Sequence, residues 1–296
     1  MEVSISGKKA AILGGDRRKL EMARRLRKAG AEVRCFGAIP EITDVVERPL
    51  ASSVAEAVEG AEIVICPTPG VANNGDLYAP FSDTPVRLDA KEWDLILSSA
   101  ILFTGGAPEW MKKAGEERGI HVAEYGHDDE GAIFNGIPTA EGALRCAIDN
   151  SDGTIHSSNI MIVGFGRVAE TTAHVFLAMG GKVFLVARRA GPRTRAFEMG
   201  CIPLPMEEID VRWEEMSVII STVPLDLFSR KRLSRSRSDQ VLIDLVSPPG
   251  STDFNAAEEL GVIVHWERGQ AGTAARFTGR NQWFLAERYL DDHFSK

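Results

Sequence analysis

The sequence contains no apolar run long enough to cross a membrane. A membrane-spanning helix needs about 18 or more consecutive apolar residues, and no stretch of this 296-residue chain approaches that length. The opening residues also lack the apolar core and the small-residue cleavage site of a secretory signal peptide. We therefore expect a cytoplasmic protein without a membrane partner.

Cysteine and histidine are scarce, and their spacing matches no metal site. The four cysteines lie far apart without a CxxC pair, and most fall within or beside apolar runs. We expect reduced, buried thiols rather than a disulfide framework. The six histidines show no HExxH or other ligand spacing, and no G-x-S-x-G element indicates a hydrolase. No metal ligand is predicted.

Basic residues are outnumbered, since 34 Lys and Arg against 42 Asp and Glu give a net charge of −8. This excess of acid argues against a nucleic acid as the main partner. The basic run 229–238 is a local exception, which we interpret as an exposed helix and loop between strands. The chain length and the hydrophobic share of 44% indicate about two domains, each with its own core.

Short apolar runs alternate with segments of helical periodicity, which is typical of a parallel sheet covered by helices on both faces. The series begins with a strand over 9–13, a helix over 17–29 and a second strand over 33–36. It restarts after the polar segment 149–159 with a strand over 160–163, followed by a helix and a further strand. The predicted fold class is therefore α/β, with two doubly wound parallel-sheet lobes.

This restart also predicts the domain boundaries. Residues 1–150 are expected to form a flavodoxin-like lobe for substrate binding or assembly, and residues 151–280 a Rossmann lobe. A connecting helix is expected over 139–148, with Thr139 as its N-cap. Residues 281–296 also have helical periodicity, and we expect this C-terminal helix to pack back on the first lobe.

The second lobe opens with a dinucleotide-binding fingerprint. Residues 160–169 form a strand that runs into G-x-G-x-x-A and then a helix, which is the context that this fingerprint requires. Gly164 permits the sharp turn, Gly166 lets the backbone approach a pyrophosphate, and Ala169 lets the helix lie close to the strand. The pyrophosphate is expected at the helix N-terminus, where free N–H groups attract anions.

The residues after the next strand indicate which dinucleotide binds. An NAD site usually has Asp or Glu about 20 residues after the glycines, whereas this sequence has Arg188 and Arg189 there, with Arg193 and Arg195 just beyond. Guanidinium groups bind a 2′-phosphate through charge-assisted hydrogen bonds, so NADP is the predicted cofactor. For Arg193 and Arg195 the alternative is that they only solubilise a loop.

The first lobe imitates this motif but does not reproduce it. After its first strand comes Gly14-Gly15-Asp16, and the Asp16 carboxylate would occupy the helix N-terminus that a phosphate needs. We therefore expect Asp16 to cap the helix and this lobe to bind no nucleotide. The adjacent Arg17 and Arg18 either hold a substrate carboxylate or belong to a basic helix face, and both interpretations are open.

Several short motifs accompany the fingerprint, of which Ile-Pro-Thr-x-Glu-Gly and Thr-Asp-Phe are far more specific than the glycines. These motifs lie at 14–16, 128–129, 135–142, 154–156, 164–167, 187–188, 198–200, 222–224 and 244–254. Because of them the sequence, along most of its length, resembles the family of bacterial dipicolinate synthase A subunits.

This resemblance implies a two-lobed fold of the formate/glycerate dehydrogenase type and an NADP-dependent oxidoreductase. It also implies oxidation of a dihydrodipicolinate-type intermediate to pyridine-2,6-dicarboxylate (dipicolinate), the calcium-chelating acid of spores, and therefore a role in sporulation. A smaller flavoprotein-like B subunit is the implied partner, and we also expect a homo-oligomer.

One loop departs from the family. Where the family has a Pro- and Gly-rich loop expected on the nicotinamide side, this sequence keeps the spacing over 266–280 but has Arg268 and Arg276 at two proline positions and Phe277 at a lysine position. The substrate is therefore open. Another small cyclic or 2-oxo dicarboxylate is the first alternative, and a non-catalytic NADP-binding subunit is the second.

These motifs yield the candidate site residues. Cofactor binding is assigned to Gly164, Phe165, Gly166, Arg167, Val168, Arg188, Arg189, Thr222, Val223, Pro224 and Asp244. The substrate set, chosen for cations and hydrogen-bonding groups, is Arg17, Arg18, Ser247, Arg268 and Arg276. Glu141 is the candidate proton acceptor, with Asn135 and Thr139 in the same catalytic set. Two alternatives stay open: Glu141 is a surface or capping carboxylate, and Asp244 only holds a turn.

Overall fold

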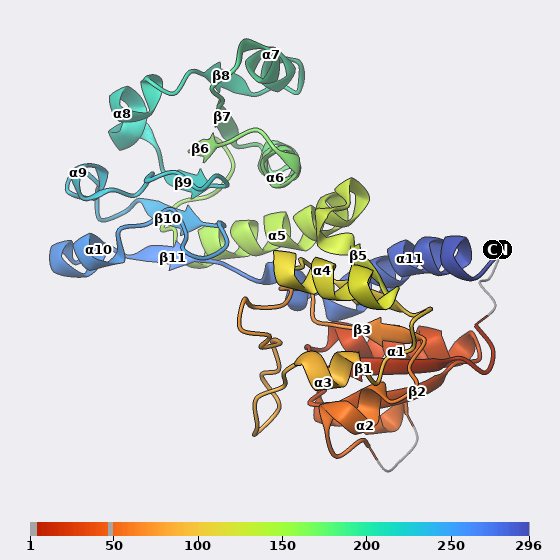
Figure 1. The fold of residues 1–296 in the computed structure, drawn as a ribbon. Coiled ribbons are helices and arrows are strands. Elements are labelled where there is room, and N and C mark those ends of the chain that lie inside the picture. The colour runs from red at the N-terminus through yellow and green to blue at the C-terminus, as the bar shows by residue number, and fades with distance from the viewer. Residues whose placement is uncertain (1–4, 47–49, 296) are drawn as a thin grey trace. The chain divides into compact units, whose positions relative to one another are not determined.

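The computed structural model describes residues 5–46 and 50–295, which group into two compact units (Figure 1). The N-terminal unit comprises the chain up to Ala132 together with the chain from Ala274, and the central unit comprises Ile133–Thr273. These limits differ from the predicted 1–150, 151–280 and 281–296. The difference arises because helices α5 (Asp129–Asp149) and α11 (Ala275–Phe294) both begin before the predicted positions.

Thr139 is not an N-cap, which corrects the prediction for the connecting helix. α5 begins at Asp129 and continues through Pro138. The Thr139 hydroxyl donates to the Asn135 carbonyl oxygen at 2.7 Å, one turn earlier in the same helix. The segment 266–280 is likewise not one loop, since η4 (Gln270–Gly272) and the first turns of α11 lie within it.

The N-terminal unit contains a five-stranded parallel sheet with the order β2-β1-β3-β4-β5. The strands are β1 (Lys9–Leu13), β2 (Glu32–Phe36), β3 (Ile63–Ile65), β4 (Ile101–Thr104) and β5 (His121–Glu124). The remaining elements are α1 (Arg18–Lys28), η1 (Pro40–Asp44), α2 (Val54–Val58), α3 (Ala90–Trp93), α4 (Glu109–Arg118) and η2 (Tyr125–His127). This strand order is that of flavodoxin.

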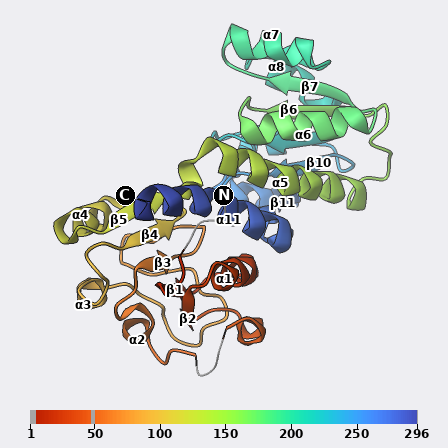
Figure 2. The same cartoon turned by 90° about the vertical axis from the view of Figure 1, so that its right-hand side faces the viewer.

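Helices cover both faces of this sheet, because its buried strands are apolar on both sides. α1 and α11 pack side by side on one face (Figure 2), with Met22, Leu26 and Leu285 in their shared core. The other face is covered by α2, α3 and α4, through residues that include Trp93 and Met111. The C-terminal helix therefore crosses back to the N-terminal unit, as the sequence predicted.

The central unit contains a six-stranded parallel sheet with the order β11-β10-β9-β6-β7-β8. Its strands are β6 (Asn159–Val163), β7 (Lys182–Val186), β8 (Ile202–Leu204), β9 (Val218–Ser221), β10 (Val241–Asp244) and β11 (Val264–Trp266). Its remaining elements are α6 (Arg167–Ala178), α7 (Ala190–Glu198), α8 (Glu208–Arg212), η3 (Trp213–Glu215), α9 (Arg230–Leu233) and α10 (Phe254–Leu260). This is the Rossmann order, so the predicted fold class is confirmed for both units.

The two cores of the central unit lie on opposite faces of its sheet. Residues of α5, α6 and α7 form one core, and residues of α8, α9 and α10 form the other. The basic run 229–238 forms α9 and the loop after it, and its arginines bind acids: Arg230 pairs with Glu259, and Arg232 with Asp210. These charges are neutralised within the fold. Across the described parts of the chain, no helix is both long and apolar enough to cross a membrane.

Candidate functional site

A cavity of about 330 Å³ lies at the carboxyl ends of β6, β7 and β9 in the central unit. Its wall includes Gly164 and Phe165 after β6, Arg188 and Arg189 after β7, and the loop 223–225 after β9. The strand order of this sheet changes direction at β6 and β9. In open α/β sheets, ligands bind outside the carboxyl ends of the strands at such a switch point.

Gly164 is required by the local backbone geometry. Its φ of 122° lies in a region that residues with a side chain rarely adopt. A Cβ atom at this position would also lie 2.2 Å from the Thr222 hydroxyl oxygen. That hydroxyl donates to the Val163 carbonyl oxygen at 2.9 Å. Thr222 therefore ties the end of β9 to the end of β6, and the turn at Gly164 has no room for a side chain.

Neither the backbone conformation nor any neighbouring atom requires a glycine at position 166. Gly166 is the N-cap of α6, and its φ of −132° is open to any residue. A Cβ atom here would meet no heavy atom within 4 Å. The open space lies at the N-terminus of a twelve-residue helix, where N–H groups and the helix dipole favour an anion. These residues fit a dinucleotide pyrophosphate, and the fully buried Ala169 keeps α6 close to the sheet.

Arg188 and Arg189 give the cavity its charge. Both side chains are exposed, and neither has an acidic partner among the described residues. The described wall of the cavity contains no Asp or Glu. Arg193 adds a role that the sequence did not reveal, because its Nη1 donates to the carbonyl oxygens of Ala187 and Arg188, both at 2.9 Å. Arg195 instead pairs with Glu198 on the surface of α7.

Two predicted cofactor residues near Gly166, Arg167 and Val168, form the first turn of α6 and do not line the cavity. Asp244 does not line it either. Asp244 is fully buried, and its carboxylate accepts hydrogen bonds from Val246 N at 3.0 Å, Ser251 N at 2.7 Å and the Thr252 hydroxyl at 2.7 Å. These contacts give Asp244 the role of holding the loop after β10.

The predicted substrate residues of the central unit are Ser247 and Arg268, both exposed. Ser247 lies on the loop that Asp244 holds. The Arg268 guanidinium lies 4.5 Å from the ring centre of Trp266, a distance typical of cation–π stacking. The Trp266 indole donates to the Val246 carbonyl oxygen at 2.8 Å. Trp266 therefore connects Arg268 with the Ser247 loop and restricts the orientation of its guanidinium.

The other predicted substrate residues belong to the N-terminal unit. Arg17 is exposed and pairs with Glu41 at 3.4 Å. Arg18 is buried and bonds the Asp16 carboxylate through Nε at 2.8 Å and Nη2 at 2.7 Å. Arg276 is exposed in the first turn of α11. Arg17 and Arg18 thus already have acidic partners.

Asp16 is not the N-cap of α1, which is Arg17, and this corrects the prediction. Its carboxylate nevertheless accepts a hydrogen bond from the Arg18 backbone N–H at 3.1 Å, at the start of the helix. Burial raises its pKa, but the hydrogen bonds and charge of Arg18, together with the charge of Lys19, outweigh burial and hold the pKa below its usual value. The carboxylate is therefore charged at neutral pH and occupies the position that a phosphate would need.

The predicted catalytic residues lie on α5 but face different directions. Asn135 and Thr139 are half-buried, and their spacing of four residues places them on one side of the helix. Glu141 follows Thr139 by two residues, a rotation of about 200°. It is exposed on the opposite side, which it shares with Ile137 and Ile148. The helix therefore brings Asn135 and Thr139 together but not Glu141.

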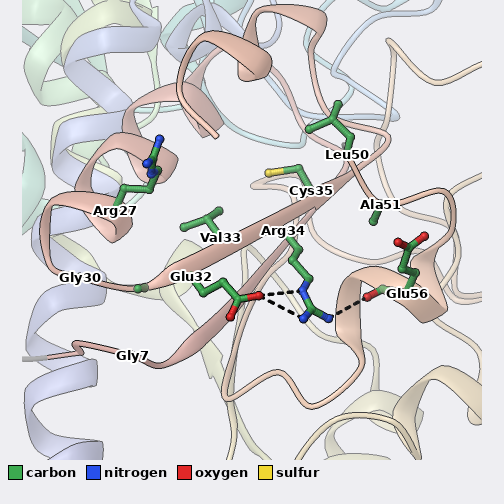
Figure 3. A pocket seen from close by; sticks show the side chains of 11 residues that line it. Gly7, Arg27, Gly30, Glu32, Val33, Arg34, Cys35, Leu50, Ala51 and Glu56 are labelled. Carbon is green, nitrogen blue, oxygen red and sulfur yellow. Dashed lines mark hydrogen bonds and ion pairs between the residues drawn. The ribbon is translucent and has the colours of Figure 1, made fainter. Parts of the chain in front are cut away.

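A larger cavity of about 490 Å³ lies beside the edge strand β2 (Figure 3). Its wall carries an ion pair between Arg34 and Glu32 at 3.1 Å, and Arg34 also donates to the Glu56 carbonyl oxygen at 3.5 Å. None of the predicted site residues lines it. It is therefore not the candidate site.

Comparisons with known proteins point to the family that the motifs resemble. A family model described as the N-terminal domain of the dipicolinate synthase A subunit matches residues 9–126. Over 272 residues, the chain is 28% identical to the A subunit of dipicolinate synthase from Bacillus subtilis (strain 168), covering 92% of this chain and 91% of that protein.

Solved structures extend the similarity to the fold. The A subunit of dipicolinate synthase from Bacillus halodurans matches with a TM-score of 0.85 at 27% identity, covering 97% of this chain and 99% of that chain. The corresponding dipicolinate synthase structure from Bacillus subtilis matches with a TM-score of 0.86 at 27% identity, covering 98% of each chain.

Two more distant structures, each 14% identical, show the fold alone. They are the transhydrogenase from Sinorhizobium meliloti, with a TM-score of 0.61 over 95% of this chain and 94% of that chain, and an L-alanine dehydrogenase, with a TM-score of 0.59 over 94% and 88%. The family model, the sequence match and the two closely similar structures agree with one another. This chain is therefore similar in sequence and in fold to the dipicolinate synthase A subunits, the family that its motifs resemble.

Proposed function

We propose that the chain is an NADP-dependent oxidoreductase that converts a dihydrodipicolinate-type intermediate to dipicolinate. The observation that supports the cofactor most directly is the cavity after β6, β7 and β9. Its wall includes Arg188 and Arg189, two cations without acidic partners in the described structure, and Phe165, which directly precedes the open space at Gly166. An NAD site would be expected to present a carboxylate to the ribose hydroxyls in this position.

The chain's own residues then position the reactants. The N-terminus of α6 holds the pyrophosphate, Arg188 and Arg189 hold the 2′-phosphate, and Arg193 fixes the loop that carries them. When bound, NADP⁺ supplies the hydride acceptor. The dihydropyridine ring also loses a proton, and the aromatic product supplies much of the driving force, so the protein mainly orients the ring and neutralises two carboxylates.

Arg268 is the central unit's candidate for one of these carboxylates. Stacking on Trp266 restricts its guanidinium before the substrate arrives, which lowers the entropy lost on binding. Glu141 stays the proton acceptor predicted from sequence, and Asn135 and Thr139 stay hydrogen-bonding residues for the substrate. Its exposure on α5 favours the alternative of a surface carboxylate.

A different substrate is the second candidate function. Arg268 stands where the family has a proline, and in this structure its guanidinium stacks on the ring of Trp266. Another cyclic or 2-oxo dicarboxylate is therefore the alternative substrate. The relatives are A subunits, so we also propose that the partner is a B subunit, in line with the flavoprotein-like protein expected from the sequence. A homo-oligomer, a role in sporulation and a cytoplasmic location are part of the same proposal.

The test separates the nucleotide from the substrate. NADPH is expected to raise the melting temperature of the purified chain more than NADH does, because a ligand that binds only the folded state stabilises it. Dihydrodipicolinate and NADP⁺ are then supplied, and the absorbance of the aromatic pyridine product is followed with and without the B subunit. Stronger stabilisation by NADH would refute NADP as the cofactor. Turnover of another dicarboxylate, but not of dihydrodipicolinate, would support the alternative substrate.

A further inference from the structure

The N-terminal unit carries polar groups that the proposed function leaves unexplained. Its strand order changes direction between β1 and β3, and such a switch point is where open α/β sheets bind ligands. Lys19 lies on α1 just after β1, Tyr125 directly follows β5, and the Cys66 carbonyl directly follows β3. Hydrogen bonds connect these three residues at the carboxyl ends of the strands.

Lys19 is a buried cation without an acidic partner. Its side chain is almost fully buried, with 1% of the residue exposed, and its Nζ donates to the Tyr125 hydroxyl at 3.0 Å. Within the described residues this phenol is its only hydrogen-bonding partner, and no carboxylate lies within ion-pair distance. Lysines are almost never fully buried unless they are paired. An unpaired buried charge is costly because it has lost its hydration.

The neighbouring groups do not supply the missing negative charge. The Asp16 carboxylate is bound at two points by Arg18, so Asp16, Arg18 and Lys19 together carry one surplus positive charge. Burial raises the pKa of the Cys66 thiol to about 12, even though the charge of Lys19 acts in the opposite direction. The thiol is therefore neutral. The Tyr125 hydroxyl donates to the Cys66 carbonyl oxygen at 3.4 Å, near the upper limit for a hydrogen bond.

Glycines allow the surrounding loops to pack closely against one another. A Cβ atom on Gly15 would lie 2.6 Å from Lys19 Cγ, so the lysine stem lies directly against the loop after β1. A Cβ atom on Gly105 would lie 1.5 Å from the Thr68 carbonyl oxygen, and one on Gly126 would lie 1.9 Å from the Gly105 carbonyl oxygen. The loops after β3, β4 and β5 are therefore packed backbone against backbone.

A polar side chain of α11 that contacts the loop after β3 has an atom without a partner. The Gln282 side chain on α11 donates from Nε2 to the Thr68 hydroxyl at 2.7 Å. Its Oε1 is buried without a hydrogen bond, and so is Nδ2 of the adjacent Asn281. Buried polar atoms of this kind are rare in folded proteins and call for an explanation such as a ligand.

We propose that Lys19 and Tyr125 form an anion site that binds a carboxylate of the substrate. This inference rests on the proposed dicarboxylate chemistry. A carboxylate accepts hydrogen bonds from Lys19 Nζ and from the Tyr125 hydroxyl, which gives up only a weak contact with Cys66. The negative charge of the carboxylate also offsets the surplus positive charge that Asp16, Arg18 and Lys19 carry together. The sequence pointed to Arg17 and Arg18, but both already pair with acids, and the next residue is the cation that lacks a partner.

The test uses the full chain without nucleotide and the product analogue pyridine-2,6-dicarboxylate. Lys19→Met removes the charge and keeps the length of the side chain. We expect the dicarboxylate to raise the melting temperature of the unmodified chain and Lys19→Met to weaken its binding about tenfold or more. Tyr125→Phe is expected to weaken it less. Lys113→Met, which alters a surface lysine on α4, is the matched control, and uncharged pyridine-2,6-dicarboxamide is the ligand control.

A second readout distinguishes a binding role from a structural one. Removing an unpaired buried charge is expected to leave the melting temperature of the free chain unchanged or to raise it. Dicarboxylate binding to Lys19→Met at the affinity of the unmodified chain overturns the proposal, and so does equal stabilisation by the diamide. If Lys19→Met melts at a lower temperature, the proposal stands only if Tyr125→Phe still weakens dicarboxylate binding.

NADPH binding, followed by its fluorescence, keeps this test separate from the proposed function. Lys19→Met is expected to bind NADPH as the unmodified chain does, because Lys19 belongs to the N-terminal unit and the nucleotide cavity belongs to the central unit. Failure of the unmodified chain to bind NADPH would refute the proposed function. Loss of the dicarboxylate effect in Lys19→Met would still support the anion site.

Discussion

Gly166→Ala separates the stability of the protein from its ability to bind a dinucleotide. At φ −132° and ψ −176° the backbone accepts an alanine without strain, and the added Cβ atom meets no protein atom within 4 Å. Replacing a glycine under these conditions stabilises the folded state by about 0.4–1 kcal/mol, because the unfolded chain loses freedom. For a unit of this size, that corresponds to roughly 1–4 °C in melting temperature.

The same methyl group would stand in the space that we assign to the pyrophosphate. Forcing an extra carbon into an occupied space costs about 1–3 kcal/mol, which weakens NADPH binding by roughly 5- to 150-fold. Titration of NADPH fluorescence measures the affinity, and thermal unfolding without ligand measures the stability. NADPH binding at the original affinity would refute our placement of the pyrophosphate.

Gly164→Ala is the matched control, because it changes the same loop with the opposite expected effect on stability. At φ 122° an alanine is strained by about 1–3 kcal/mol, and its Cβ atom would lie 2.2 Å from the Thr222 hydroxyl. This variant is expected to melt at a lower temperature even without ligand. Equal effects of the two variants on the free protein would contradict the distinction that we draw between the two glycines.

The remaining predictions concern charged residues. Arg188→Ser is expected to weaken NADPH binding about tenfold or more while leaving NADH binding unchanged, because only the 2′-phosphate is affected; equal losses for both nucleotides would refute its role. Asp244→Ala is expected to destabilise the chain by about 3 kcal/mol or more in urea unfolding, since three donors lose their buried acceptor; an unchanged midpoint would contradict this. Glu141→Gln tests the proton acceptor, because turnover within a few-fold of the unmodified enzyme would eliminate that role.

Apolar patterning predicted most of the fold because buried parallel strands are marked by uninterrupted apolar runs. β1 begins and ends where the sequence places it. β8 was not predicted, and the reason is visible in its composition. It is a three-residue edge strand with Pro203 at its centre. Proline is tolerated on an edge, but it removes the pattern by which a strand is recognised.

α5 shows how tertiary packing overrides local propensity. Gly136, Pro138 and Gly142 disfavour a helix locally, so the sequence predicted a start at Thr139. In the fold, a Cβ atom on Gly136 would lie 3.2 Å from the Thr171 hydroxyl, and one on Gly142 would lie 2.4 Å from Gln270 Oε1. The glycines let α5 approach its neighbours closely. Contacts between residues far apart in sequence therefore determine where this helix starts.

The nucleotide site was predictable in part. Gly164 and Gly166 follow from the fingerprint, and Arg188 and Arg189 from their distance to it. The role of Arg193 was not predictable, because it depends on the path of the backbone carbonyls after β7. Asp244 was placed in the cofactor set because it ends a strand. Which way its carboxylate turns is decided by the loop 245–252, whose donors it satisfies.

Lys19 shows what the sequence could have revealed in the N-terminal unit. Met22, Ala23 and Leu26 form the buried stripe of α1, and Lys19 precedes them by three, four and seven residues. These are the spacings of one helix face. A lysine on an otherwise apolar stripe must be buried with its charge, and such a charge requires a partner. Because Arg17 and Arg18 stand beside it, the three cations look alike in the sequence, and the helix period is the feature that separates them.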